Sequence, residues 1–407
     1  APNVDADNGT VTVNEGQPAD NTGTFSDPGG DTVTITASSG SVTQDDVTGT
    51  WSWSFDTSDG PDETRTVTIT ATDTGLAATG VTFELVVNNV APDVTLTGPA
   101  NTNEGNTESY SFTASDPGND TFSLVTQDCG ANGTLSNPSF SSTTGAGSFD
   151  CDFPDGPADS NVRVQVADSD GANSNFGAIA VDIANVAPEV DAGPPVENFS
   201  GEVHNVLADF TDDGVLDTHT ATIDWGEGAD SEIASVTQGD GFGTVSGSHR
   251  YFIPGIYTIE VTVTDIDGGV GSGSTEKTVL RLVVTIDIKP GSDPNSINPG
   301  GKGLIPVGVF SGTYRGLVFD AAEITGSSLA FEGAGITHKA PHLEDLDGAG
   351  AQDSVSHYRI PETSLTSASV EGCLTGETSS GIFFTGCGLV NIVPPEDSET
   401  GGKGKEK

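Results

Sequence analysis

Carboxylates are the side chains of this sequence with the greatest capacity for chemistry. The 407 residues contain 60 Asp and Glu against 13 Lys and Arg, which gives a formal net charge of -47. Before Arg250, only Arg65 and Arg163 are basic. Such a surface repels nucleic acid and anionic lipid, and its self-repulsion opposes folding unless cations bind. We therefore expect divalent cations as partners and no nucleic acid; the alternative is an acidic surface that serves only solubility in salty surroundings.

The four cysteines form two local pairs, and each pair predicts a disulfide. The pairs are Cys129 with Cys151 and Cys373 with Cys387, and neither is flanked by histidine or further cysteine at the spacing of a zinc site. Each disulfide is worth about 3 kcal/mol and indicates an oxidising exterior, so we predict an extracellular or cell-surface location. No stretch reaches about 18 apolar residues, which predicts no membrane insertion. The chain also lacks methionine, from which we expect a processed or excised chain.

The sequence offers little for nucleophilic catalysis. Residues 1–187 contain no His and no Lys, and their two Cys form a predicted disulfide, so a Ser-His-Asp triad, a Cys-His pair or a lysine Schiff base cannot be assembled there. The chain has no Gly-x-Ser-x-Gly elbow, no His-Glu-x-x-His helix and no phosphate loop. A glycosidase pair of carboxylates needs a cleft and usually aromatic platforms, whereas this chain has only 3 Trp and 5 Tyr. We predict that the chain is not an enzyme.

A repeated phrase, Asn-Val-Ala-Pro, organises the chain that positions these residues. It stands at 89–92 and at 185–188, and the chain begins with its second half. Proline fixes φ and biases the preceding residue toward extended geometry, so the phrase suits a taut joint between modules. The joints divide the chain into a first module at 1–90, a second at 91–187, a third at 188–285 and a fourth at 286–395, followed by a polar tail at 396–407 that we expect to be disordered.

Hydrophobic periodicity predicts the fold class. With 33% hydrophobic and 6% aromatic residues, each core must be thin. Apolar residues alternate with a period of two, as at 51–55 and 67–71, and the runs are separated by Gly-, Asp- and Pro-rich turns, which is typical of β-sandwiches. No sustained helical spacing occurs. We therefore predict an all-β protein made of tandem Ig-like β-sandwich domains in an elongated array.

The first two modules share short words in the same order, which indicates tandem duplication. Asn-Glu-Gly at 14–16 recurs at 103–105, and Ser-Asp-Pro-Gly at 26–29 recurs at 115–118. Together with the Asp-rich turn at 168–171 and the Asn-bearing joints, these words resemble bacterial cadherin-like and Ig-like repeats.

In cadherin-like arrays such positions bind calcium between successive domains, so the resemblance implies calcium here. Calcium takes six to eight oxygen ligands, and a site shared by two modules would stiffen their joint. The first joint departs from the pattern, because Asp73-Thr74-Gly75 lacks the second acid of an Asp-x-Asp turn. For any single acid the alternative is a turn residue or a solvated carboxylate. The implied ligands are Glu15, Asp73, Asn89 and Asp93 at the first joint, and Glu104, Asp168, Asp170, Asn185 and Glu189 at the second.

The third module carries the most specific run of motifs. Asp224-Trp225-Gly226, His249-Arg250-Tyr251 and Gly255-Ile256-Tyr257 stand in an order that closely resembles the PKD-type domain, an Ig-like sandwich common in secreted proteins. The resemblance implies that Trp225 fills the core and that Tyr257 makes a tyrosine-corner hydrogen bond. We expect His249 to be structural rather than catalytic or metal-binding.

The fourth module resembles an uncharacterised C-terminal β domain of secreted proteins, a resemblance carried by Ile-Asp-Ile-Lys-Pro-Gly-Ser at 286–292. Its Asp-rich loop at 345–353 has oxygens at positions one, three and nine, which resembles an EF-hand or dockerin-type calcium loop with Asp345, Asp347 and Asp353 as ligands. Ala349 at position five and the lack of Glu at position twelve favour a weak or rebuilt site that uses Glu344 or a backbone carbonyl.

Three histidines surround this loop: His338, His342 and His357. They could bind zinc or another transition metal. A turn that contains proline separates the first two, however, and the third lies beyond the loop. We therefore expect structural hydrogen bonds from these histidines.

These observations predict an extracellular structural or adhesive protein: a stalk, surface-layer or filament subunit built of calcium-stiffened β-sandwich modules. Its partners would be calcium ions, copies of itself, other surface proteins or polysaccharide. The alternative is a non-catalytic substrate-binding or spacer region of a large secreted hydrolase. Exposed Trp51 and Trp53 would favour this alternative, and burial of both would remove its main support.

Overall fold

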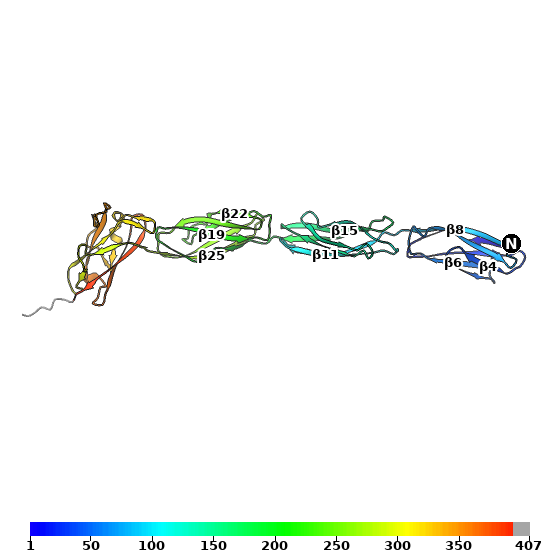
Figure 1. The fold of residues 1–407 in the computed structure, drawn as a ribbon, viewed down its shortest axis with the longest axis horizontal. Helices are drawn as coiled ribbons and strands as arrows, with labels where there is room; N and C mark the ends of the chain where they lie inside the picture. The colour runs from blue at the N-terminus through cyan, green and yellow to red at the C-terminus, as the bar shows by residue number, and fades with distance from the viewer. Residues whose placement is uncertain (394–407) are drawn as a thin grey trace, which may run out of the picture. The chain divides into compact units, whose positions relative to one another are not determined.

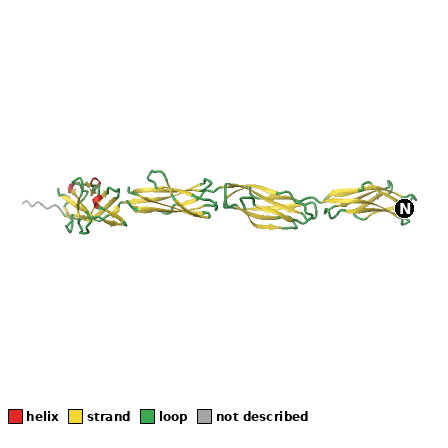
Figure 2. Ribbon diagram, turned by 90° about the horizontal axis from the view of Figure 1, so that it is seen from above, coloured by secondary structure: helices red, strands yellow, loops and turns green. Residues whose placement is uncertain are grey.

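The computed structural model describes residues 1–393, so the predicted tail at 396–407 lies outside the described residues. Between residues 1 and 393 the secondary structure consists of β-strands and short 3-10 turns, with no α-helix (Figures 1 and 2). Contacts divide the chain into two compact units: residues 1–186 with 213–217 form the first, and residues 187–212 with those from 218 onward form the second. The prediction of an all-β protein built of Ig-like sandwiches is confirmed.

The first module, in the first unit, consists of two four-stranded sheets. The strand order is β1-β3-β6-β5 in one sheet and β2-β8-β7-β4 in the other. β2 runs parallel to β8, whereas the other pairs are antiparallel. The strands are β1 (Asn3–Ala6), β2 (Thr10–Asn14), β3 (Pro18–Ser26), β4 (Val33–Ala37), β5 (Ser41–Asp45), β6 (Thr50–Asp56), β7 (Arg65–Asp73) and β8 (Ala78–Asn88).

The second module repeats this topology strand for strand. Its sheets have the orders β9-β11-β14-β13 and β10-β16-β15-β12, and β10 runs parallel to β16. The common topology fits the duplication indicated by the shared words. The strands are β9 (Asp93–Thr97), β10 (Asn101–Asn103), β11 (Thr107–Ser115), β12 (Ser123–Asp128), β13 (Thr134–Phe140), β14 (Gly147–Asp152), β15 (Ala158–Ala167) and β16 (Gly177–Ala184).

Period-two alternation builds the core of each sandwich. In β7, Val67, Ile69 and Ala71 are fully buried while the threonines between them point away from the core. In β6, Trp51 and Trp53 are each 1% exposed, and their Nε1–H groups donate to the carbonyls of Asp5 and Ser39. Both tryptophans therefore belong to the core, which removes the main support for the alternative of a substrate-binding surface.

The third module adds a fifth strand to the same plan. Its sheets have the orders β17-β19-β23-β22 and β18-β25-β24-β20-β21. The strands are β17 (Glu189–Asp191), β18 (Val196–Phe199), β19 (Val203–Thr211), β20 (Thr220–Asp224), β21 (Glu232–Ile233), β22 (Ser235–Gly239), β23 (Phe242–Arg250), β24 (Gly255–Thr264) and β25 (Val270–Leu280).

The residues that carry the PKD resemblance have the predicted structural roles. Trp225 is 6% exposed and lies in the core. The hydroxyl of Tyr257 donates to the carbonyl of Ile253, four residues upstream, at 2.7 Å. His249 stacks on Trp225, with ring centroids 5.0 Å apart, and its Nε2 lies 2.8 Å from Glu227 Oε2. These contacts hold His249 as a structural residue.

The fourth module has a different topology and its own core. Its main sheets are β26-β37-β36-β32-β33 and β27-β29-β35-β34. Strand β26, which precedes the predicted boundary at residue 286, already pairs with β37. The elements are β26 (Leu282–Val283), β27 (Ile286–Ile288), β28 (Ser296–Ile297), β29 (Leu304–Val309), β30 (Gly312–Tyr314), β31 (Leu317–Phe319), η1 (Ala321–Glu323), η2 (Gly326–Ser328), β32 (Ala330–Phe331), β33 (Ala334–Gly335), β34 (His342–Glu344), β35 (Asp353–Arg359), η3 (Ile360–Glu362), β36 (Glu371–Glu377), β37 (Phe383–Leu389) and β38 (Asn391–Ile392).

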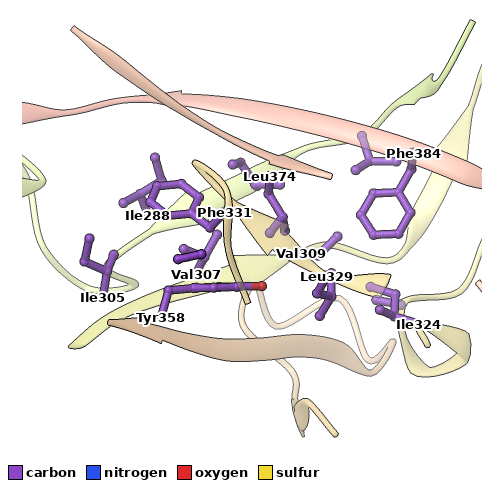
Figure 3. Packing of buried hydrophobic residues seen from close by; sticks show 14 of the residues in the cluster. Ile288, Ile305, Val307, Val309, Ile324, Leu329, Phe331, Tyr358, Leu374 and Phe384 are labelled. Atoms are coloured by element: carbon purple, nitrogen blue, oxygen red, sulfur yellow. The ribbon is translucent and has the colours of Figure 1, made fainter. Parts of the chain in front are cut away.

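Aromatic and branched side chains fill the core of the fourth module (Figure 3). Phe331 and Tyr358 lie with ring centroids 5.6 Å apart, and both are fully buried. The predicted disulfides are both present: Cys129–Cys151 in the second module and Cys373–Cys387 in the fourth.

Candidate metal centre

Glu15 lies at the centre of a group of acidic residues where the first module meets the second, inside the first unit. It follows the last residue of β2 and precedes Gly16, whose φ of 72° closes the turn. Its side chain is 0% exposed. Its Oε2 accepts the N–H of Gly60 at 2.8 Å, and its Oε1 accepts the N–H of Val90 at 2.7 Å. Because Val90 belongs to the Asn-Val-Ala-Pro phrase, this carboxylate fixes the joint to the first module.

The second module contributes the turn Asp116–Asp120, which connects β11 to β12. Asp116 Oδ1 accepts the N–H of Gly118 at 2.8 Å. A Cβ at Gly118 would lie 2.5 Å from both Glu15 Oε2 and Asp120 Oδ2, so any side chain at this position would displace these carboxylate oxygens. The N–H of Asn119 donates to the carbonyl of Ser58 in the first module at 2.8 Å. The turn is therefore seated directly against the first module.

Carboxylates from both modules converge around Asp120. Oxygens of Glu15, Asp116 and Asp120 all lie within 4.8 Å of one another, and so do oxygens of Asp59, Asp120 and Asp170. Asp120 is 9% exposed. Its Oδ1 accepts the hydroxyl of Ser169, whereas its Oδ2, like Asp116 Oδ2, is buried and has no hydrogen-bond partner among residues 1–393. A buried charged oxygen without a partner is costly, and a cation would satisfy it.

Asn89 and Asp168 extend the group along the joint. Asn89 Nδ2 donates to Asp168 Oδ2 at 3.1 Å, and Asp168 Oδ1 accepts the N–H of Ala172 at 2.8 Å. Asn89 Oδ1 is buried and has no partner within the described part of the chain. An amide oxygen and a carboxylate oxygen are both ligands that calcium accepts. We name the joint cluster by its seven members: Glu15, Asp59, Asn89, Asp116, Asp120, Asp168 and Asp170.

Burial and the crowding of like charges perturb the pKa values of acids in the joint cluster. Burial, together with repulsion from Glu15, Asp120 and Asp168, raises the pKa of Asp116 to about 6, although its bond from Gly118 acts in the opposite direction. Burial and repulsion from neighbouring carboxylates, Asp120 foremost, also raise the pKa values of Asp59 and Asp170. These shifts have the direction expected for acids that share one site without a neutralising cation.

The pKa of Asp116 predicts how stability depends on pH when calcium is chelated. Between pH 3.8 and about pH 6, the Asp116 carboxyl binds its proton more tightly in the folded chain than in the unfolded chain. The free energy of unfolding therefore falls as pH rises through that window. We expect the melting temperature of the chelated chain to be higher near pH 5 than near pH 7. A cation bound by this carboxylate would compete with the proton, so its affinity should fall below about pH 6.

Asp116→Asn is the control. General repulsion between the many acids also lowers the melting temperature as pH rises, so wild type alone cannot isolate Asp116. The difference in melting temperature between wild type and Asp116→Asn isolates the contribution of this one carboxyl. If the melting temperatures of the two proteins changed equally between pH 5 and pH 7, the prediction would be contradicted.

The structure distributes the predicted first-joint ligands over both ends of the first module. Glu15 and Asn89 belong to the joint cluster, whereas Asp73 lies with Asp27 and Asp31. Asp73 ends β7, and the 11-residue strand β8 then carries the chain back toward Asn89. At about 3.3 Å per residue, β8 spans roughly 35 Å. A residue at the end of β7 therefore cannot share a site with Asn89.

The same strand geometry places the predicted second-joint ligands at both ends of the second module. Asp168 and Asp170, which follow β15, lie in the joint cluster with Glu15. Glu104 lies at the other end of the second module, where its oxygens accept the N–H groups of Gly156 and of Val186, the residue that follows Asn185. Asp93 and Glu189 are exposed first residues of β9 and β17. The sequence analysis missed Asp59, Asp116 and Asp120 as candidate ligands. Asp116 belongs to the repeated Ser-Asp-Pro-Gly, and Asp59 begins an Asp-Gly-Pro at 59–61 that recurs at 155–157.

The Asp-rich loop of the fourth module uses its carboxylates for backbone hydrogen bonds. Asp353 is 1% exposed, and its two oxygens accept the N–H groups of Ser311 and Leu346. Asp345 accepts the N–H groups of Gly348 and Gly350, and Asp347 accepts that of Ala349. These bonds close the loop, so calcium at Asp345, Asp347 and Asp353 remains a prediction with weaker structural support than the joint cluster has.

Comparison with known proteins defines the class of the third module. Residues 185–280 match the family described as the PKD domain, which confirms the resemblance carried by Trp225, His249 and Tyr257. No curated protein matches the chain. Within the described residues, no helix combines the length and apolar character that crossing a bilayer requires.

Solved structures of tandem cadherin and Ig ectodomains are similar to this chain at low identity. Protocadherin gamma B2 extracellular cadherin domains 3–6 are 14% identical, covering 97% of this chain and 99% of that chain, with a TM-score of 0.25. The human desmocollin-1 ectodomain is 12% identical, covering 96% and 79%, with a TM-score of 0.24. The ICAM-5 D1-D4 ectodomain fragment is 10% identical, covering 97% and 100%, with a TM-score of 0.34.

Proposed function

We propose that this chain is an extracellular structural or adhesive protein whose first two modules are held together by calcium. The observation that carries the proposal is the joint cluster, in which carboxylates of Glu15, Asp116 and Asp120 from two modules converge within 4.8 Å. The ligand atoms of this set are all oxygens, which calcium prefers. Many transition metals instead favour nitrogen and sulfur ligands. The two disulfides support a location outside the reducing cytosol.

The mechanical role of the ion follows from where its ligands originate. Glu15, Asp59 and Asn89 come from the first module, whereas the other four members of the joint cluster come from the second. Without a cation, the carboxylates repel one another across the joint. With calcium bound, the same charges attract one ion, and ion binding adds to the free energy that holds the modules together. Bound calcium would therefore convert a repulsive joint into a rigid one.

Small-angle X-ray scattering of the full chain, with chelator and with excess calcium, tests the proposal. We expect calcium to change the scattering profile of wild type and to do so much less for Asp120→Asn, which removes the shared charge. Asp182→Asn, at an exposed position in β16, should behave as wild type. A wild-type profile that is identical with and without calcium would overturn the proposal.

Gly118 gives a steric test of the same site. In Gly118→Ala the new methyl group would meet Glu15 Oε2 and Asp120 Oδ2, each at 2.5 Å, so both oxygens must move away from the ion. We expect the calcium concentration at half-transition of the scattering change to rise at least about tenfold, which corresponds to about 1.4 kcal/mol.

Gly29→Ala is the matched control, because Gly29 occupies the same word in the first module. There the Cβ would meet Asp27 Oδ1 at 2.9 Å and Asp31 Oδ2 at 3.2 Å, both outside the joint cluster. Its calcium midpoint should therefore equal that of wild type. Equal midpoints for all three proteins would mean that calcium acts elsewhere.

We further propose that the partners beyond calcium are copies of this chain, other surface proteins or polysaccharide. The net charge of -47 opposes association with acidic partners unless cations bridge the two surfaces. The alternative of a substrate-binding region in a secreted hydrolase has lost its aromatic pair, since Trp51 and Trp53 are buried.

A further inference from the structure

The fourth module brings three histidines from separate segments to one place. His342 begins β34 and is paired with Val355 of β35, so His357 stands two residues further along β35 on the same face. His338 follows β33, and its neighbour Thr337 donates its N–H to the carbonyl of His357 at 2.9 Å. The strand register and this hydrogen bond together fix the three backbones. The juxtaposition is thus built into the fold of the module.

The imidazole rings are arranged as a tripod. One ring nitrogen from each histidine can be chosen so that all three lie within 4.8 Å of one another. The ring centroids are 5.5 Å apart for His338 and His342, 6.0 Å for His338 and His357, and 6.1 Å for His342 and His357. The rings stand nearly perpendicular to one another, with interplanar angles of 70°, 85° and 81°.

These distances are close to those of a tetrahedral metal site. Zn–N bonds of about 2.0–2.1 Å at tetrahedral angles place the ligand nitrogens about 3.4 Å apart and the ring centroids about 5 Å apart. The observed ring centroids are further apart than in that geometry by about 0.5 to 1 Å.

A second observation points to a ligand at the tripod. Nδ1 of His357 is buried and has no hydrogen-bond partner anywhere in residues 1–393, although buried polar atoms normally have one. His338 and His342 are exposed, so an ion can enter from solvent. The expected structural hydrogen bonds are therefore absent at His357 Nδ1.

We propose that His338, His342 and His357 bind a transition-metal ion of the zinc class, with the fourth coordination position open to water or to a donor from another molecule. Imidazole ligands suit zinc, copper and nickel, whereas calcium prefers oxygen. Glu344 lies on the same face of β34 as His342, two residues further along. This carboxylate adds favourable charge beside the tripod. The site is independent of the joint cluster and of the proposed calcium function.

Zinc titration of the full chain by calorimetry, with calcium in excess to occupy the acidic sites, tests the proposal. Wild type should bind one zinc ion at the tripod. His342→Ala and His338→Ala should each weaken that binding by more than about 100-fold. This exceeds the 10- to 100-fold loss typical when a residue that only hydrogen-bonds to a metal ligand is replaced. Lys339→Ala, an exposed neighbour in the same turn, is the matched control and should bind zinc as wild type does.

Cobalt supplies a second readout, because its visible absorption distinguishes tetrahedral nitrogen ligation from octahedral oxygen ligation. We expect the tetrahedral spectrum in wild type and its loss in both histidine variants. If His342→Ala disturbs the fold by circular dichroism, His338→Ala in the turn provides the same test. Zinc binding that both variants retain, or no zinc binding by wild type in excess calcium, would overturn the proposal.

Discussion

Replacing Glu15 with alanine should lower the free energy of unfolding of the first module by about 3–5 kcal/mol in the presence of calcium. The carboxylate is 0% exposed and accepts the N–H groups of Gly60 and Val90. Its removal leaves the buried N–H of Gly60 and the partly buried N–H of Val90 without their acceptor, and an unpartnered buried donor costs about 1–3 kcal/mol. The variant also loses a proposed ligand of the joint cluster, so calcium should stabilise it less than it stabilises wild type.

Tryptophan fluorescence during urea unfolding measures this effect. In a Trp225→Phe background, Trp51 and Trp53 of the first module remain as the only tryptophans. Glu84→Ala, at an exposed position of β8, is the control and should change the free energy of unfolding by less than about 0.5 kcal/mol. A loss below about 1 kcal/mol for Glu15→Ala would show that the two hydrogen bonds do not hold the joint.

The strands and the core residues could be predicted because local patterns determine them. Alternation placed Trp51, Trp53 and Val67 on strands, and the structure buries all three. The PKD resemblance placed Trp225 in the core and Tyr257 at a tyrosine corner, and both placements are confirmed. In each case the relevant signal lies within about ten residues of sequence, so no long-range information was required.

The grouping of acids into sites could not be predicted in the same way. Strand direction decides which end of a module an acid occupies. Asp73 is separated from Asn89 by the length of β8, and Asp168 is separated from Asn185 by the length of β16. Repeated motifs such as Ser-Asp-Pro-Gly are equally consistent with a turn and with a metal-binding segment. Only the contact between two modules shows that Asp116 faces Glu15.

The histidine tripod illustrates the same limit. His338 and His342 are close in sequence, but His357 joins them only through the pairing of β34 with β35. A shift of that register by one residue would turn His357 to the opposite face of the sheet. The sequence spacing therefore favoured a structural role for these histidines. Their convergence depends on the register between β34 and β35.

Replacing Trp53 with alanine should lower the free energy of unfolding of the first module by about 3–5 kcal/mol. The indole is 1% exposed, packs edge-on against Phe83 with ring centroids 4.9 Å apart, and donates to the Ser39 carbonyl at 2.6 Å. The substitution removes this packing and leaves that carbonyl without its indole donor. Urea unfolding followed by circular dichroism measures the change, and Phe176→Ala, which truncates a side chain that is 50% exposed, is the control expected to lose far less.

The same variant separates the two functional hypotheses. A tryptophan that served as a platform for polysaccharide would be exposed, so its loss would abolish retention on an insoluble polysaccharide and leave stability unchanged. A core tryptophan gives the opposite result: stability falls, and whatever retention the folded protein has stays the same. We expect the second outcome, because Trp51 and Trp53 both point into the sandwich. The first outcome would restore the substrate-binding alternative and would contradict the burial on which the structural role depends.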